Sequence, residues 1–248
     1  MRFFEVLGQI ILLTLEALTS LITQRWELRA WVLQFYAIGV LSLSITNITA
    51  IFTGMVLSLQ ASFALSRFGA EAFVGDLVSL SITRELGPVL TALLVGGRVG
   101  AGITAELGSM KVTQQLDAMR AMATSPVHKL VVPRIVACVI CLPILTMIAN
   151  FLGILGGMFL SSVELNIDAH YYLSRVIHAL DMGDVISGLG KSVFFGFFIG
   201  IIACNNGMNV EGGADGVGNA TTATVVNASI VVLVSDFFLT KIFYLLGS

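Results

Sequence analysis

Four charged residues lie in otherwise apolar segments and are the side chains of this sequence best placed to do chemistry. Arg84 and Glu85 are adjacent, Lys191 lies in a second apolar segment, and Asp236 lies in a third. A charge near the centre of a bilayer costs at least about 2.5 kcal/mol, so these groups should face one another or a watery cavity. They can form ion pairs with each other.

These four charges lie at similar depths in their expected helices. At about 1.5 Å per residue, Arg84-Glu85, Lys191 and Asp236 lie roughly 10, 9 and 14 Å from the outer ends of three expected spans. One interpretation is a layer of ion pairs that holds the helices together. The other, compatible with the first, is that the layer also lines or gates a substrate path open to the outer face. Other charges within or beside the spans are Arg98, Glu106 and Lys241.

The elements that position these residues are predicted to be membrane-spanning helices. Of the 248 residues, 56% are hydrophobic and only 11% are charged, whereas a soluble domain carries roughly 25% charged residues. A helical span needs about 20 apolar residues. The expected spans cover about 30–66, 77–103, 135–163, 185–208 and 221–245. The first is too long for one straight helix and is interpreted as a tilted or broken span, with a two-pass hairpin as the alternative.

The residues before these spans have a different pattern. Apolar residues recur at three- and four-residue spacing from Phe3 to Ile22, with Glu5 and Glu16 between them. This pattern predicts an amphipathic helix lying in the membrane interface, and an imperfect first span is the alternative. We therefore divide the chain into an interfacial elbow helix, 1–29, and a transmembrane domain, 30–248.

The connections between the spans differ in charge, and this difference orients the chain. Residues 104–134 are the most basic connection, so the positive-inside rule places them in the cytoplasm, with a helix expected at about 108–123. Residues 164–184 are acidic and are expected on the outer side, with a short surface helix. Residues 209–220 are expected to be a glycine-rich turn. The N-terminus would then be cytoplasmic and the C-terminus on the outer side.

Patterns typical of enzymes are missing from the sequence. It contains no Walker motif and no His-Glu-x-x-His, and its three histidines all fall in connections, where they cannot pair with an intramembrane serine. The pair Cys138 and Cys141 is interpreted as small packing residues of a helix. We therefore expect no catalytic site, no metal site and no cofactor bound by this chain.

Several segments resemble the MlaE/YrbE family of bacterial ABC-transporter permeases. The resemblance begins with RELGPVLTALLVGGRVGAGITAELGSM from Arg84, followed by QLDAM. It continues in SPVHKLVVPRIVACVICLPILT, in GKSVFFG around Lys191 and in ATTATVVNASIVVLVSDFFLT around Asp236. It covers most of the chain from about residue 40 onward, whereas the first 30 residues match the family's elbow helix in pattern only.

The resemblance implies an all-α integral membrane protein of the bacterial inner membrane. It would be a homodimeric, multi-pass permease that moves phospholipids between the inner and outer membranes and so maintains outer-membrane lipid asymmetry. The implied partners are a cytoplasmic ABC ATPase that binds ATP and Mg²⁺, a STAS-domain protein and a periplasmic MCE-domain hexamer, with no nucleic acid.

The resemblance also implies roles for particular residues. The functional charges of the family match Arg84, Glu85, Lys191 and Asp236. The cytoplasmic helix at about 108–123 resembles the coupling helix that docks on the ATPase, and its candidate contact residues are Lys111, Gln114, Asp117 and Arg120. Two other functions are weighed against this one. They are a stand-alone ion- or proton-coupled carrier, with Asp236 or Glu106 as its carboxylate, and a membrane scaffold without a transport path.

Overall fold

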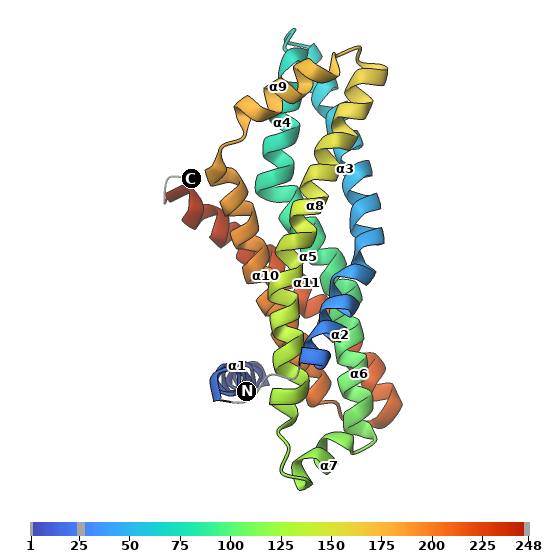
Figure 1. Cartoon of the computed structure of the whole chain (residues 1–248), viewed down its shortest axis with the longest axis vertical. Coiled ribbons are helices and arrows are strands. Elements are labelled where there is room, and N and C mark those ends of the chain that lie inside the picture. The colour runs from blue at the N-terminus through green and yellow to red at the C-terminus, as the bar shows by residue number, and fades with distance from the viewer. Residues whose placement is uncertain (1, 24–27, 246–248) are drawn as a thin grey trace. The chain divides into compact units, whose positions relative to one another are not determined.

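The computed structural model describes residues 2–23 and 28–245, and this part of the chain forms helices and turns without any β-strand (Figure 1). Five helical segments are long and apolar enough to cross a membrane: Arg29–Ser66, Glu71–Val112, Val127–Glu164, Met182–Met208 and Gly213–Leu245. The predicted all-α fold with five spans is therefore confirmed, and the chain is a multi-pass membrane protein.

The helices belong to two compact units. Unit 1 comprises Met1–Ser42, Ala92–Leu142 and Phe194–Val234. Unit 2 comprises Leu43–Thr91, Pro143–Val193 and Ser235–Ser248.

The N-terminal part of unit 1 contains helix α1 (Arg2–Thr23), helix α2 (Leu28–Ile38) and the 3₁₀ turn η1 (Val40–Ser42). The predicted amphipathic helix corresponds to α1, and residues 24–27 of the predicted elbow lie outside the described residues. The break after α2 falls at Gly39, where a Cβ would lie 3.0 Å from Cys141 Sγ and 2.8 Å from the Phe35 carbonyl oxygen.

In unit 2, helix α3 (Leu43–Ser66) follows η1 directly. The segment Arg29–Ser66 is a single candidate span. The interpretation of residues 30–66 as one long broken span is therefore confirmed, and the two-pass hairpin is wrong.

The second span, Glu71–Val112, is a nearly continuous helix that is interrupted twice by a π-helical turn. It runs through η2 (Glu71–Phe73), α4 (Val74–Ser81), η3 (Ile82–Leu86), α5 (Gly87–Val95), η4 (Gly96–Gly100) and α6 (Ala101–Val112). The π turns are η3 and η4. Each carries charged residues of the predicted site, and single π turns in α-helices are frequently found at functional sites.

The predicted single helix at about 108–123 is wrong, because the chain breaks within it. Helix α6 ends at Val112, Gln114 has a left-handed backbone with φ 60°, and the short α7 (Gln115–Ala121) begins after it. An α-helix cannot continue through a left-handed residue. The residues around the break are exposed and polar, so no apolar face holds the segment straight. The π turn η5 (Val127–Val131) then leads into α8 (Val132–Glu164).

The remaining helices are α9 (Ala169–Ala179), α10 (Met182–Met208) and α11 (Gly213–Leu245). Helix α9 is the short helix expected between 164 and 184. It packs on α4 within unit 2 (Figure 1). The Asp168 side chain caps it by accepting from the Tyr171 N–H at 3.0 Å.

The glycine-rich turn expected at 209–220 is wrong for most of its length, because α11 begins at Gly213. Gly212 and Gly213, with φ of 89° and 69°, make the turn. Gly216 lies inside the helix, where a Cβ would come within 1.8 Å of the Glu211 carbonyl oxygen. Glycine is needed at this position for close approach of the backbone and not for a turn.

Candidate functional site

The side chain of Lys191 is the centre of the candidate site and is only 1% exposed. It extends from α10 in unit 2, next to two glycines that bring neighbouring segments close. A Cβ on Gly188 would lie 2.2 Å from the Thr83 carbonyl oxygen, and one on Gly190 would lie 3.0 Å from the Phe243 ring. These close approaches place the lysine within reach of both η3 and α11.

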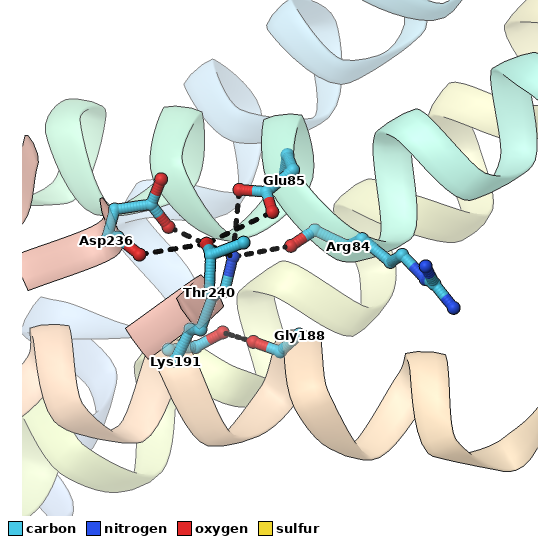
Figure 2. Close-up of polar contacts among 7 residues, drawn as sticks. Arg84, Glu85, Gly188, Lys191, Asp236 and Thr240 are labelled. Carbon is cyan, nitrogen blue, oxygen red and sulfur yellow. Dashed lines mark hydrogen bonds and ion pairs between the residues drawn. The ribbon is translucent and has the colours of Figure 1, made fainter. Parts of the chain in front are cut away.

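Acceptors from η3 and α11 surround the ammonium group of Lys191 (Figure 2). Nζ donates to Thr240 Oγ1 at 2.7 Å, to Glu85 Oε2 at 2.8 Å and to the Arg84 carbonyl oxygen at 3.0 Å. Asp236 Oδ1 lies 3.1 Å away in an ion pair that is not aligned as a hydrogen bond. An ammonium has three N–H donors, so these contacts satisfy it fully. One lysine thus links three separate segments.

The π turn η3 makes two of these contacts possible. It presents the Glu85 carboxylate and the Arg84 carbonyl oxygen together toward Nζ. The next residue, Gly87, leaves the room that Asn150 of α8 occupies, because a Cβ there would lie 1.7 Å from Asn150 Oδ1. Packing of α8 against the turn therefore depends on this glycine.

The side chain of Arg84 does not join this cluster, in contrast to its predicted place in the ion-pair layer. It points away from Lys191 (Figure 2), and its Nε donates to Asp184 Oδ1 at 2.5 Å. Neighbouring residues on a helix point in different directions, so the Arg84 and Glu85 side chains diverge. The predicted layer is therefore two groups: the Lys191 cluster, comprising Glu85, Lys191, Asp236 and Thr240, and the pair of Arg84 with Asp184.

Two members of these groups were missed by the sequence analysis. Asp184 was assigned to the acidic outer connection, but it lies in the first turn of α10 and is almost fully buried. Thr240 is uncharged, and its hydroxyl also lies 3.2 Å from Glu85 Oε1 and 2.8 Å from the Asp236 carbonyl oxygen. Its position four residues after Asp236, on the same helix face, was the available signal.

The exposure of the charged groups separates their roles. The Arg84 side chain is 48% exposed and that of Glu85 is 40% exposed, whereas Lys191 is enclosed. Arg84 is thus the cation that an incoming anion can reach, and Glu85 is the accessible partner of the buried lysine. The Lys191 cluster holds two carboxylates against one ammonium, so a change at either carboxylate alters its charge balance.

Comparison with known proteins decides the family. The sequence model of the family described as Permease MlaE matches residues 31–242. The chain belongs to the MlaE permease family. It is 42% identical to a probable ABC transporter permease protein of Rickettsia felis, over 98% of this chain and 94% of the relative. It is 39% identical to the intermembrane phospholipid transport system permease protein MlaE of Haemophilus influenzae, over 98% of this chain and 93% of the relative.

A third relative of this MlaE-family chain, a probable ABC transporter permease protein of Synechocystis, is 40% identical over 98% of this chain and 92% of the relative. The resemblance found in the sequence is therefore confirmed, and the matched range includes every candidate site residue. None of these names describes a catalytic activity.

The remaining intramembrane or interfacial charges of this MlaE permease are placed differently from Lys191. Arg98, in η4, is exposed and donates to Ser42 Oγ at 2.8 Å and to the Ala37 carbonyl oxygen at 3.3 Å. Glu106 forms an ion pair with the fully buried Arg134 at 2.9 Å. Lys241 is exposed and has no ion pair within residues 2–23 and 28–245.

The predicted coupling residues of this family member surround the break between α6 and α7. Asp117 forms ion pairs with Lys111 at 3.3 Å and with Arg120 at 3.2 Å. Gln114 is the exposed left-handed residue before α7, and Leu116 is fully buried. The α7 turn is thus anchored by one leucine and presents its charges outward.

An ion pair that the sequence did not reveal joins the connection before α10 to α4. Arg175 of α9 donates from Nε to Asp76 of α4 at 2.9 Å, and its guanidinium lies 4.5 Å from the centre of the Phe73 ring. The hydrogen bond with Asp76 raises the pKa of Arg175. Burial raises the pKa of the neighbouring Tyr172. These contacts hold α9 against the helix that leads into η3.

Unit 2 also contains an apolar groove along α3. Its volume is about 500 Å³, and Leu86 of η3 contributes to its wall. The α3 residues that line it include Thr49, Phe52, Val56 and Gln60. In the described part of the chain, no group of three or more His, Cys, Asp and Glu residues is arranged to hold a metal ion.

Proposed function

We propose that this chain is the permease subunit of an ABC transporter that moves phospholipids between the inner and outer membranes of a bacterium. Membership of the MlaE family and the name of the Haemophilus influenzae relative support this proposal. The observation that carries it is the fully buried Lys191, held by carboxylates from two segments and lying beside an exposed Arg84.

The two cations have different tasks in this proposal. The planar guanidinium of Arg84 binds phosphate well and is accessible, so it meets the lipid phosphate by exchanging Asp184 for it. Lys191 is enclosed, so its task is to hold η3 to α11 through Glu85, Asp236 and Thr240. Movement of Glu85 away from Lys191 releases this link and opens the path.

A homodimer is part of the proposal. The spans that contain α3 and α11 are only 17% buried over their most apolar stretch, whereas the other three are 50–56% buried. A second copy covering these two faces, and the groove of α3, would enclose apolar space for lipid acyl chains.

The partners and orientation follow from the same proposal. The N-terminus and α7 lie in the cytoplasm, where Lys111, Gln114, Asp117 and Arg120 contact a separate ATPase that binds ATP and Mg²⁺. The C-terminus lies in the periplasm, as does α9. A STAS-domain protein and a periplasmic MCE-domain hexamer complete the complex, and this chain carries no cofactor or catalytic site of its own.

Reconstitution tests this function directly. The chain is coexpressed with the ATPase of its own genome, placed in liposomes, and assayed for ATP-dependent transfer of a fluorescent phospholipid. We expect transfer by the native chain and a loss of at least tenfold for Arg84→Glu, since about 1.4 kcal/mol corresponds to tenfold and reversal of a phosphate contact costs more. The matched control is Arg67→Glu, which reverses an exposed arginine in the turn after α3.

Two results would contradict the proposal. One is lipid transfer driven by an ion gradient without ATP, which would favour a stand-alone carrier. The other is full transfer activity in Arg84→Glu with the ATPase still bound, which would remove the role assigned to the exposed cation.

A further inference from the structure

Of the residues that line a cavity in unit 1, the function proposed above uses only Arg120. The cavity has a volume of about 190 Å³ and lies between α1, α7 and the end of α10. Its polar lining residues are Gln9 and Glu16 of α1, Arg120 of α7, and Asn205 and Asn209 of the α10 end. Pockets that combine an apolar wall with a few converging polar groups are typical ligand sites.

Glu16 and Arg120 both line this cavity and carry opposite charges, but they do not pair with each other. The Glu16 carboxylate has no hydrogen bond or ion pair within the described residues. Arg120 uses Nη1 for Asp117 Oδ1 at 3.2 Å, and a guanidinium has five N–H donors. Glu16 and Arg120 form no ion pair with each other, so the cavity can accept a group between them that carries both charges.

An amide network forms the end of the cavity. Asn209 Nδ2 donates to the Asn205 carbonyl oxygen at 2.9 Å and lies 3.4 Å from Gln9 Oε1. Asn205 is buried. These contacts fix neutral donors and acceptors between α1 and α10, so the cavity is polar although apolar helices form it.

The same helix α1 also offers apolar surface beside this cavity. Ile11, Leu12, Leu15 and Leu18 are exposed. A small apolar cavity of about 50 Å³ continues along α1, where Ala17 and Leu21 face Val132 and Phe197. An amphipathic helix with an apolar face of this kind lies in the membrane interface, where phospholipid headgroups and acyl chains meet.

We propose that this cavity binds the headgroup of a zwitterionic phospholipid with a primary ammonium, of the ethanolamine class. Glu16 accepts from the ammonium, Arg120 donates to the phosphate, and the acyl chains lie along the exposed apolar face of α1. A lipid with only a negative headgroup leaves Glu16 unpaired and is repelled by it. The bound lipid links α1 to α7, and so acts on the segment that carries the predicted coupling residues.

Photolabelling of the purified full chain in nanodiscs tests the proposal. The probe is a phosphatidylethanolamine with a photoreactive group near the headgroup, and labelled peptides are mapped by mass spectrometry. We expect labels at 9–16 and 205–209, displaced by phosphatidylethanolamine and much less by phosphatidylglycerol. Glu16→Gln should reduce this labelling about tenfold, since a hydrogen bond between charged groups contributes about 1.5 kcal/mol or more.

Matched variants separate recognition from local structure. Glu211→Gln removes an exposed carboxylate that does not line the cavity and should be labelled like the native chain. Arg120→Gln should lose labelling, whereas Asp117→Asn breaks the same ion pair but leaves the guanidinium in place and should keep it. All variants are first checked for native elution and thermal unfolding.

Three results would overturn the proposal. They are native labelling that avoids both segments, equal displacement by phosphatidylglycerol, and unchanged labelling of Glu16→Gln. Displacement by free phosphoethanolamine but not by the lipid would assign the cavity to a soluble ligand instead. The Arg84→Glu variant should keep this labelling, so failure of this proposal is distinguishable from failure of the transport function.

Discussion

Among the described residues, each unit of this MlaE-family permease contains one fully buried cation, and the two are held in different ways. Lys191 of unit 2 has two carboxylates, a hydroxyl and a carbonyl oxygen around its ammonium, supplied by η3 and α11. Arg134 of unit 1 has one carboxylate, that of Glu106, and the Leu130 carbonyl oxygen, while its Nε has no partner within the described residues.

The carboxylates in the two units also differ in their contact with solvent. The Glu106 side chain is 60% exposed, so water or lipid headgroups can solvate it without Arg134. Asp236 is half-buried and Glu85 is partly exposed, so loss of Lys191 leaves two neighbouring negative charges poorly solvated. The Lys191 cluster is therefore interdependent, whereas the Arg134 pair is a local anchor of α8 to α6.

Removal of Lys191 should therefore have the largest effect in the molecule. Lys191→Met keeps the length of the side chain but leaves two carboxylates facing each other, and breaking a buried ion pair costs about 3–5 kcal/mol. We expect a corresponding loss in the free energy of unfolding in detergent, with lipid transfer abolished. Lys241→Met, at an exposed lysine without an ion pair in the described residues, is the control. Equal stability of both variants would show that the cluster is not interdependent.

In the Arg134 pair, removal of the carboxylate should cost more stability than removal of the cation. Glu106→Gln leaves a fully buried guanidinium with a weaker partner and should cost about 2 kcal/mol, the value typical of a hydrogen bond to a charged group. Arg134→Met removes the buried charge and leaves an exposed carboxylate, so it should cost less, about 1 kcal/mol. Thermal unfolding of the two variants under one condition compares them. A larger loss for Arg134→Met than for Glu106→Gln would mean that Glu106 also depends on the pair.

The difference between these cations was only partly visible in the sequence. Lys191 stood out because it interrupts an apolar run. Its depth in the expected span is similar to the depths of Glu85 and Asp236, so the three were grouped. Arg134 was counted among the basic residues of a connection, because residues near the end of a span look alike in sequence whether they are buried or exposed. The exposed charge at Arg84 was grouped with the wrong partners, since depth gives height along a helix and not direction around it.

The fold was predictable in its spans and not in its interruptions. Charge-free runs such as 135–163 indicated the membrane helices, because a bilayer core excludes charge. The π turns η3 and η4 depend on a shift of backbone hydrogen bonds that side-chain types do not encode. The helical Gly216 was missed for a similar reason, because close approach of the Glu211 carbonyl, and not a turn, requires glycine there.

The smallest expected effect on stability is that of removing the Thr240 hydroxyl from the Lys191 cluster. Thr240→Val keeps the shape of the side chain but removes a hydroxyl that accepts from Lys191 at 2.7 Å. Glu85, Asp236 and the Arg84 carbonyl oxygen remain around Lys191. The bonds of the hydroxyl to Lys191, Glu85 and the Asp236 carbonyl oxygen are therefore lost without exposing an unpaired charge, at a net cost of about 1 kcal/mol. Thermal unfolding measures this cost, and Thr222→Val, at an exposed threonine that bonds only within α11, is the control.

Lipid transfer by Thr240→Val then shows whether the Lys191 cluster only holds the helices together or also gates the lipid path. If Lys191 must release Glu85 to open the path, a cluster with one contact fewer should open more easily. Thr240→Val should then transfer lipid at least as fast as the native chain despite its lower stability. A rate that falls in proportion to stability would instead mean that the carboxylates around Lys191 only hold the helices together, as the single carboxylate beside Arg134 does.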